Sequence, residues 1–171
     1  MRVLVLSSGA YGVNGGIGLY NRDIVEALAA MDSVREIVLL PQLIQRPVED
    51  LPPKVRHNAK AARGKISFVG ASLAELRHAF DLIVVGHINQ MPLAASLNLK
   101  WRAPLVLMVY GIDVWTQPKP WSKFLAGQCD AIWSISQVTT ERMNSWAALP
   151  PAKYGQLPNA IHLDNYPATG G

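Results

Sequence analysis

The sequence lacks the features by which small or unfolded chains are recognised. It contains one cysteine, Cys129, among 171 residues, so no disulfide can form within the chain. It has no Asn-x-Ser/Thr sequon, and both absences are typical of a reducing compartment. Only 16% of the residues are charged while 50% are hydrophobic, a composition that excludes intrinsic disorder. We therefore expect one folded domain of ordinary size.

The sequence also lacks a hydrophobic run that could span a membrane. The longest stretch without a formal charge, residues 82–99, is interrupted by His87, Asn89, Gln90 and Pro92. The apolar run at 3–6 is too short for the core of a secretory signal. These absences predict a cytoplasmic protein.

The net charge of +4 is only mildly basic, but five cations gather in one stretch without acidic residues. They are Lys54, Arg56, Lys60, Arg63 and Lys65. A solvated surface explains them most simply, and an anionic partner, such as a phospholipid surface or a phosphate-bearing substrate, is the alternative. No aromatic residues interleave with these cations, so we expect no nucleic-acid partner.

Short apolar runs alternate with helical patterns along the whole chain. Strands are expected at residues 3–6, 37–40, 82–85, 105–109, 131–135 and 154–157. Helices are expected at about residues 17–31, 72–80, 92–97, 120–126 and 139–147. Ser72 and Glu75 have the spacing of a capping box, and three prolines predict irregular structure over 41–65. Nearly all-apolar strands between helices predict an α/β fold, a Rossmann-like three-layer sandwich with a mostly parallel sheet.

In such folds the ligand crevice lies at the carboxyl ends of the strands. This rule selects five segments: 7–18, 87–89, 110–113, 134–136 and residue 159. Gly15, Gly16 and Gly18 open the first helix, where free N–H groups and the helix dipole favour a phosphate group. A merely tight turn is the alternative. The dinucleotide fingerprint fails because Asn21 stands where its third glycine belongs, and no Walker P-loop is present.

Three polar residues in these segments have both a structural and a functional interpretation. His87 follows a buried strand and could be a core histidine, or could donate to a substrate hydroxyl or transfer a proton. Asp113 could cap local N–H groups or bind a ligand, and Ser136 most simply caps a helix. The histidines show no paired ligand spacing and no Asp-x-Asp occurs, so neither a metal nor another cofactor is expected.

Five motifs in order carry a resemblance to a known family. They are Gly15-Gly-Ile-Gly18, Val84-Val-Gly-His87, Tyr110-Gly-Ile-Asp113-Val-Trp115, Ser134-Ile-Ser136 and Leu157-Pro-Asn159-Ala-Ile161. Together they resemble the amino-terminal, acceptor-side lobe of the retaining GT-B-fold glycosyltransferases of family 4, also called group 1. Two sites depart from the family pattern: Tyr110 replaces a common His, and His162 replaces a common Asp.

The resemblance implies a metal-independent transfer of sugar from a nucleotide-sugar donor to a glycan or lipid-linked acceptor, as in polysaccharide biosynthesis. Gly15, Gly16 and Gly18 would approach the donor phosphates and His87 would contact the transferred sugar as the catalytic residue. The acceptor side would include Asn89, Gly111, Asp113, Ser136 and Asn159. The basic stretch 54–65 would face the inner surface of the membrane, which implies a peripheral membrane protein.

The resemblance also implies a division of the chain. Residues 1–164 would form the Rossmann-like lobe, and 165–171 would be a linker or the end of this piece. The Glu-x7-Glu donor signature of the family's second lobe does not occur, so we expect the lobe to be inactive by itself. The alternatives are a non-catalytic sugar- or nucleotide-binding module of the same architecture and, less favoured, a single-domain oxidoreductase.

Overall fold

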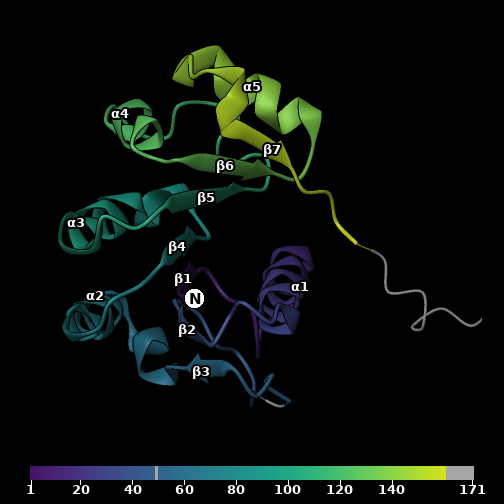
Figure 1. The fold of residues 1–171 in the computed structure, drawn as a ribbon. Coiled ribbons are helices and arrows are strands. Elements are labelled where there is room, and N and C mark those ends of the chain that lie inside the picture. The colour runs from purple at the N-terminus through teal and green to yellow at the C-terminus, as the bar shows by residue number, and fades with distance from the viewer. Residues whose placement is uncertain (49, 161–171) are drawn as a thin grey trace, which may run out of the picture.

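A computed structural model describes residues 1–48 and 50–160 (Figure 1). The seven strands described are β1 (Arg2–Ser7), β2 (Glu36–Pro41), β3 (Val55–His57), β4 (Leu82–Val85), β5 (Leu105–Val109), β6 (Ala131–Ser134) and β7 (Tyr154–Gln156). The α-helices are α1 (Gly16–Ala30), α2 (Lys65–Ala74), α3 (Met91–Trp101), α4 (Ser122–Gly127) and α5 (Gln137–Ala147). Four short 3₁₀ helices are η1 (Ala59–Arg63), η2 (Glu75–Arg77), η3 (Ile88–Gln90) and η4 (Pro151–Lys153).

The seven strands form one sheet in the order β3-β2-β1-β4-β5-β6-β7, and every pair of neighbours is parallel. The strand order reverses direction between β1 and β4, so the loops after these two strands diverge at their carboxyl ends. This is the switch point at which open α/β sheets bind their ligands. The prediction of a Rossmann-like α/β fold is confirmed, with a sheet that is entirely parallel among the described strands.

The layers follow from the alternation of side chains along the central strands. In β1, Leu4 and Leu6 belong to the core that contains residues of α2 to α5, whereas Val3 and Val5 belong to the core that contains residues of α1. Figure 1 shows α1 on one side of the sheet and α2 and α3 on the other. Both faces of the central strands are thus buried, which explains why these strands contain almost no polar residues.

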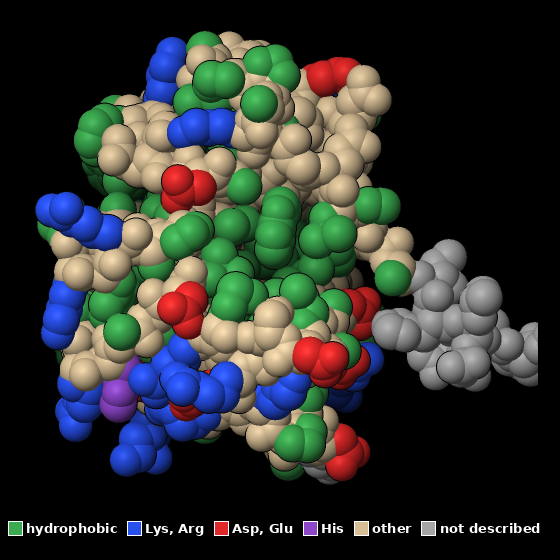
Figure 2. All heavy atoms as spheres, viewed as in Figure 1, with side chains coloured by type: hydrophobic (Ala, Val, Ile, Leu, Met, Phe, Trp, Pro, Cys, Tyr) green, Lys and Arg blue, Asp and Glu red, His purple; other side chains and the backbone are tan. Residues whose placement is uncertain are grey.

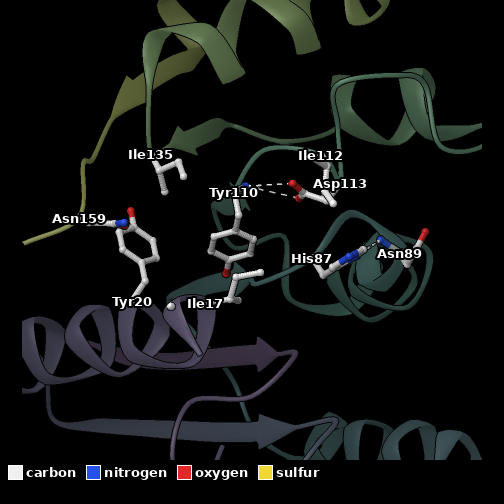
Figure 3. Close-up of a pocket in the computed structure, with 10 residues that line it drawn as sticks. Ile17, Tyr20, His87, Asn89, Tyr110, Ile112, Asp113, Ile135 and Asn159 are labelled. Carbon is white, nitrogen blue, oxygen red and sulfur yellow. Dashed lines mark hydrogen bonds between the residues drawn. The ribbon is translucent and has the colours of Figure 1, made fainter. Parts of the chain in front are cut away.

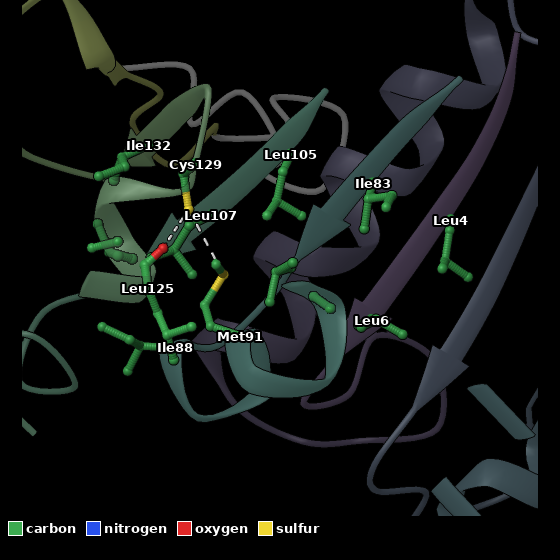
Figure 4. Close-up of a cluster of buried hydrophobic side chains, with 14 of the residues drawn as sticks. Leu4, Leu6, Ile83, Ile88, Met91, Leu105, Leu107, Leu125, Cys129 and Ile132 are labelled. Atoms are coloured by element: carbon green, nitrogen blue, oxygen red, sulfur yellow. Dashed lines mark hydrogen bonds between the residues drawn. The ribbon is translucent and has the colours of Figure 1, made fainter. Parts of the chain in front are cut away.

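The larger of the two cores contains the single cysteine (Figure 4). Cys129 is 1% exposed, and its Sγ lies 3.7 Å from Sδ of Met91 in α3. Burial raises the pKa of the Cys129 thiol to about 12, so it is protonated and unreactive at neutral pH. Cys129 therefore packs the core and has no catalytic part.

The region 41–74 differs from its prediction. The expected irregular stretch contains β3 and η1, and the helix expected from Ser72 instead runs from Lys65 and ends at Ala74. The Ser72 side chain lies inside this helix, where its hydroxyl donates to the Phe68 carbonyl at 2.8 Å. The capping-box interpretation was therefore wrong. Several apolar residues of α2, such as Ile66, point into solvent, so they do not gather on one buried face. The sequence of this helix therefore shows only a weak amphipathic pattern.

The buried carboxylate of Glu75 forms an ion pair with a partly exposed arginine and does not cap a helix. Its carboxylate accepts from the Arg56 guanidinium in β3 at 2.6 Å, and the side chain is only 5% exposed. Arg56 also binds Glu36 in β2, which binds Arg2 in β1, so one charge network crosses three strands. Burial alone would raise the pKa of Glu36, but the hydrogen bonds from the two arginines outweigh it and lower that pKa.

Over the described part of the chain, every helix is too short or too polar to cross a lipid bilayer.

Candidate functional site

A cavity of about 630 Å³ lies at the carboxyl ends of the central strands (Figure 3). It is bounded by the start of α1 and by the segments that follow β4, β5, β6 and β7. Its lining consists of Gly16, Ile17, Tyr20, His87, Asn89, Tyr110, Ile112, Asp113, Ile135 and Asn159. The cavity lies where the strand order switches, as expected for a ligand site in this fold.

The amino terminus of α1 opens onto this cavity. Gly15 precedes the helix with a φ of 99°, a backbone conformation that residues with a Cβ rarely adopt. No side chain caps the helix, and its first turn carries no acidic residue. The first N–H groups of α1 and the positive end of its dipole are thus available to an anion beside Gly16 and Ile17.

His87 lies across the cavity from this helix start and is fixed by its own loop. The Nδ1 of His87 accepts a hydrogen bond from the Asn89 N–H at 3.1 Å, drawn as a dashed line in Figure 3. In the neutral imidazole the proton is therefore assigned to Nε2. The ring is half-buried rather than sealed in the core, so Nε2–H is a donor that a ligand can reach.

Two tyrosines connect the opposite sides of the cavity. Tyr110 lies in the predicted segment 110–113 but was given no contact of its own, and Tyr20 was assigned only to the helical pattern. The Tyr110 hydroxyl donates to Asn21 Oδ1 of α1 at 2.5 Å, and its ring meets the Tyr20 ring edge-on at 5.8 Å. The Tyr20 hydroxyl donates to the Leu157 carbonyl at 2.6 Å. Burial raises the pKa of both phenols, that of Tyr20 to about 12, so both remain protonated donors. The signal for Tyr110 was its position directly after a strand. The signal for Tyr20 was its position near the start of the first helix, where it had been interpreted only as part of the helical pattern.

The loop after β5 is held by its own aspartate. The Asp113 carboxylate accepts from the N–H groups of Gly111 at 2.7 Å and Tyr110 at 3.2 Å. These bonds are the local capping of N–H groups that the sequence suggested. A carboxylate can accept further hydrogen bonds, and Asp113 also lines the cavity, so it can still accept one from a ligand.

The structure brings together five of the nine residues predicted for the donor, the sugar and the acceptor. Gly16, His87, Asn89, Asp113 and Asn159 all line the one cavity. Gly15, Gly18, Gly111 and Ser136 are outside its lining. The contacts proposed for all nine stay predictions.

Two of the residues outside the lining have structural roles. A Cβ at Gly18 would collide with the Val13 side chain, so glycine lets α1 approach the loop after β1. Ser136 caps α5, because its hydroxyl oxygen accepts from the Thr139 N–H at 3.2 Å. For both residues, packing or capping accounts for the residue type without a ligand.

The basic stretch divides into two engaged and three exposed cations. Arg56 is held by Glu36 and Glu75, and the Lys54 ammonium donates to the Met31 carbonyl at 2.8 Å. Lys60, Arg63 and Lys65 are exposed, and no described acidic side chain pairs with them. In Figure 2, Lys and Arg side chains gather over the part of the molecule where Figure 1 places α2, β2 and β3.

Within residues 1–48 and 50–160, no three His, Cys, Asp or Glu side chains are grouped closely enough to hold a metal ion. Independence from metal stays a prediction. The predicted boundary at residue 164 and the variant residue His162 lie outside the described residues.

Solved structures of glycosyltransferases resemble this fold at low sequence identity. HepE from Anabaena, in complex with UDP-glucose, matches with a TM-score of 0.65 and 16% identity, over 97% of this chain and 46% of its own. The lipopolysaccharide outer core galactosyltransferase WaaB matches with a TM-score of 0.64 and 11% identity, over 95% and 47%. The chain therefore spans less than half of either relative.

A third resemblance covers most of the matched chain as well as most of this one. Sucrose-phosphate synthase from Thermosynechococcus elongatus matches with a TM-score of 0.61 and 12% identity, over 96% of this chain and 92% of its own. No curated protein sequence matches the chain. The sequence profile of one family, however, matches residues 14–165, which is most of the chain and includes every segment around the cavity. With its parallel sheet of GT-B type, this chain belongs to Glycosyltransferase Family 4.

Proposed function

We propose that this chain is the acceptor-side lobe of a retaining glycosyltransferase that uses a nucleotide-sugar donor. The observation that carries the proposal is that Gly16 and His87, 71 positions apart in sequence numbering, line one cavity at the switch point of the sheet. An anion-binding helix terminus and a side-chain hydrogen-bond donor are two groups that suit a sugar phosphate.

The open start of α1 suits the phosphates of the donor. Backbone N–H groups at Gly15, Gly16 and Gly18 and the helix dipole would stabilise the negative charge that grows on the leaving diphosphate. Structures of HepE, one of the similar proteins, contain UDP and UDP-glucose, which supports a donor of this class. The helix terminus would then supply the stabilisation for which other transferases use a metal ion.

The reaction would proceed on one face of the sugar. The bond between the anomeric carbon and the phosphate oxygen breaks, and the acceptor oxygen bonds to the same carbon from the same side. The departing phosphate would take the acceptor proton. His87 Nε2–H would hold a hydroxyl of the transferred sugar, and Asn89, Gly111, Asp113, Ser136 and Asn159 would form the acceptor side.

This proposal requires a second lobe that holds the nucleotide. We expect purified residues 1–171 to transfer no sugar from UDP-glucose or another nucleotide-sugar, because a half-open cleft neither orients the donor nor excludes water. Release of the nucleoside diphosphate is the measurement, with the chain joined to a family donor-binding lobe as the positive control. Turnover by residues 1–171 alone would contradict the proposal.

We also propose that the exposed cations bind an anionic membrane surface. Lys60 lies in η1 and Lys65 is the first residue of α2, where the next residue, Ile66, is 90% exposed. Replacing both lysines by glutamine should weaken binding to vesicles of phosphatidylserine and phosphatidylcholine by about 30-fold, at roughly 1 kcal/mol for each cation. Co-sedimentation at low salt is the measurement, because salt screens the attraction.

The matched control for this experiment is the pair Lys119 and Lys123, which are equally exposed at the start of α4. Replacing them by glutamine removes the same charge elsewhere and should leave vesicle binding within a factor of about three. An equal or larger loss from this control pair would refute a membrane contact centred on α2.

A further inference from the structure

An apolar groove of about 530 Å³ lies between the outer surfaces of α3 and α4. Its lining shares no residue with the cavity that holds His87. Its volume is within the range of about 300–1,000 Å³ that is usual for small-molecule sites.

This groove exposes large apolar side chains from both of its walls. Leu99 of α3 is 80% exposed, and on the other wall Phe124 is 68% and Trp121 53% exposed. Single exposed apolar residues are usual, but three that line one groove indicate a binding surface. No charged side chain of the described residues lines the groove, and the Ser96 hydroxyl in its lining donates to the Pro92 carbonyl at 2.8 Å. The groove therefore favours an apolar ligand.

The groove begins beside the cavity that holds His87. Asn89 lines the cavity and Pro92 lines the groove, and they are three positions apart at the junction of η3 and α3. On the other wall, the loop after β5 carries the exposed Ile112 at the cavity and Trp121 at the groove. A ligand with its polar end in the cavity can therefore extend an apolar end into the groove.

The charges beside the groove disfavour a second copy of this chain as its occupant. Lys119, Lys123 and Arg102 are exposed, and each lies within three positions of a residue that lines the groove. Residues 82–129 contain a single acidic residue, Asp113, which lines the cavity with His87. A symmetric dimer through the groove would therefore bring like charges together.

A lipid-linked acceptor has the polar and apolar ends that this arrangement fits. To bring its sugar to His87, such an acceptor must lift the first part of its hydrocarbon chain out of the bilayer. Each CH₂ group that is then exposed to water raises the free energy, so a groove that covers the chain lowers the cost of reaching the site. Figure 1 shows α3 between α4 and α2, the helix of the proposed membrane contact, on one side of the sheet. The groove is thus one helix away from the surface that would supply the lipid.

We propose that the groove between α3 and α4 binds the hydrocarbon chain of a lipid-linked acceptor whose sugar lies in the cavity with His87. The inference rests on the proposed function, and it selects a lipid-linked acceptor over a free glycan.

The test is a titration of ¹⁵N-labelled residues 1–171 with dodecyl phosphate below its critical micelle concentration. Inorganic phosphate and a short helical peptide of glutamate and leucine are the comparison ligands. We expect dodecyl phosphate to shift the Trp121 indole N–H signal and the amide signals of Leu99 and Gln128 saturably. Inorganic phosphate should leave these signals unchanged. Equal or stronger binding of the peptide would assign the groove to a protein partner and overturn the inference, as would the absence of saturable shifts from dodecyl phosphate.

Phe124→Ser removes an aromatic ring from the open wall of the groove. Because this ring is mostly exposed, the variant should unfold at the same temperature as the unaltered chain, and it should bind dodecyl phosphate about tenfold more weakly. Leu43→Ser is the matched control, since Leu43 is an exposed apolar residue in the loop after β2, and it should bind like the unaltered chain. Equal losses from the two variants would show adsorption without a site and reject the inference.

Nucleoside diphosphate release by the two-lobed enzyme separates this inference from the proposed function. An active enzyme whose groove signals do not shift with dodecyl phosphate would reject the chain-binding groove and leave the transferase proposal intact. An inactive enzyme whose groove binds dodecyl phosphate would reject the transferase proposal and support the groove as a site for a hydrocarbon chain.

Discussion

His87→Ala should lower kcat/KM of the complete two-lobed enzyme by about 10²–10³-fold, the usual cost of losing one oriented donor at a reacting centre. The imidazole is held by the Asn89 N–H, so its Nε2–H is oriented before the sugar binds. A water molecule in the space left by alanine would not be oriented in this way. Nucleoside diphosphate release under subsaturating donor is the measurement.

Two further variants make this result specific. His87→Gln places an amide donor near the position of Nε2 and should recover part of the lost rate if the residue acts by hydrogen bonding. His78→Ala changes a histidine that precedes the amino end of β4, whereas His87 follows its carboxyl end. This variant should leave the rate unchanged. A His87→Ala enzyme within threefold of the unaltered one would remove His87 from the reaction.

Arg56→Ala should lower the free energy of unfolding by about 2–3 kcal/mol, although Arg56 belongs to a stretch of surface cations. The Glu75 carboxylate is 5% exposed and would lose its 2.6 Å hydrogen bond to the guanidinium. Breaking a buried ion pair costs about 3–5 kcal/mol. We expect less here because the Arg56 side chain is itself 43% exposed, so water can replace part of it. Urea unfolding at pH 7 is the measurement.

Lys60→Ala is the matched control, because this exposed cation of the same stretch has no acidic partner among the described residues. It should change the free energy of unfolding by less than about 0.5 kcal/mol. Combining Arg56→Ala with Glu75→Leu should restore most of the loss, because no buried charge then remains unpaired. Equal stabilities for Arg56→Ala and Lys60→Ala would show that Glu75 does not depend on Arg56.

Much of the fold could be predicted because its central strands are buried on both faces. The runs at 82–85 and 105–109 match β4 and β5 in full, since a strand between two helical layers must be apolar at every position. The region of β3, η1 and α2 was predicted poorly. There β3 has three half-buried or exposed residues, and α2 presents Ile66, Val69 and Leu73 to solvent, so neither shows the expected periodicity.

The candidate site was predicted only in part, because some of its residues follow directly after strands and others are placed by contacts between distant segments. The positions of His87 and Gly16 follow from the rule that ligands bind at the carboxyl ends of parallel strands, and both line one cavity. Tyr20 was assigned to the helix pattern and not to the site. Its place depends on the edge-on contact with Tyr110, a partner 90 positions away that no local spacing indicates.

The order of the central strands β1, β2, β4, β5 and β6, the free helix start after Gly15 and the resemblance to Glycosyltransferase Family 4 were determined by the sequence itself, because each depends on residues that are neighbours along the chain. The tertiary structure alone decided that Arg56 pairs with Glu75, that Ser72 lies inside a helix, and that the Tyr11 hydroxyl is buried without a partner among the described residues. The physical reason is that burial and pairing are set by contacts between distant segments, and a buried charge or hydroxyl is stabilised only by the partners that folding brings to it.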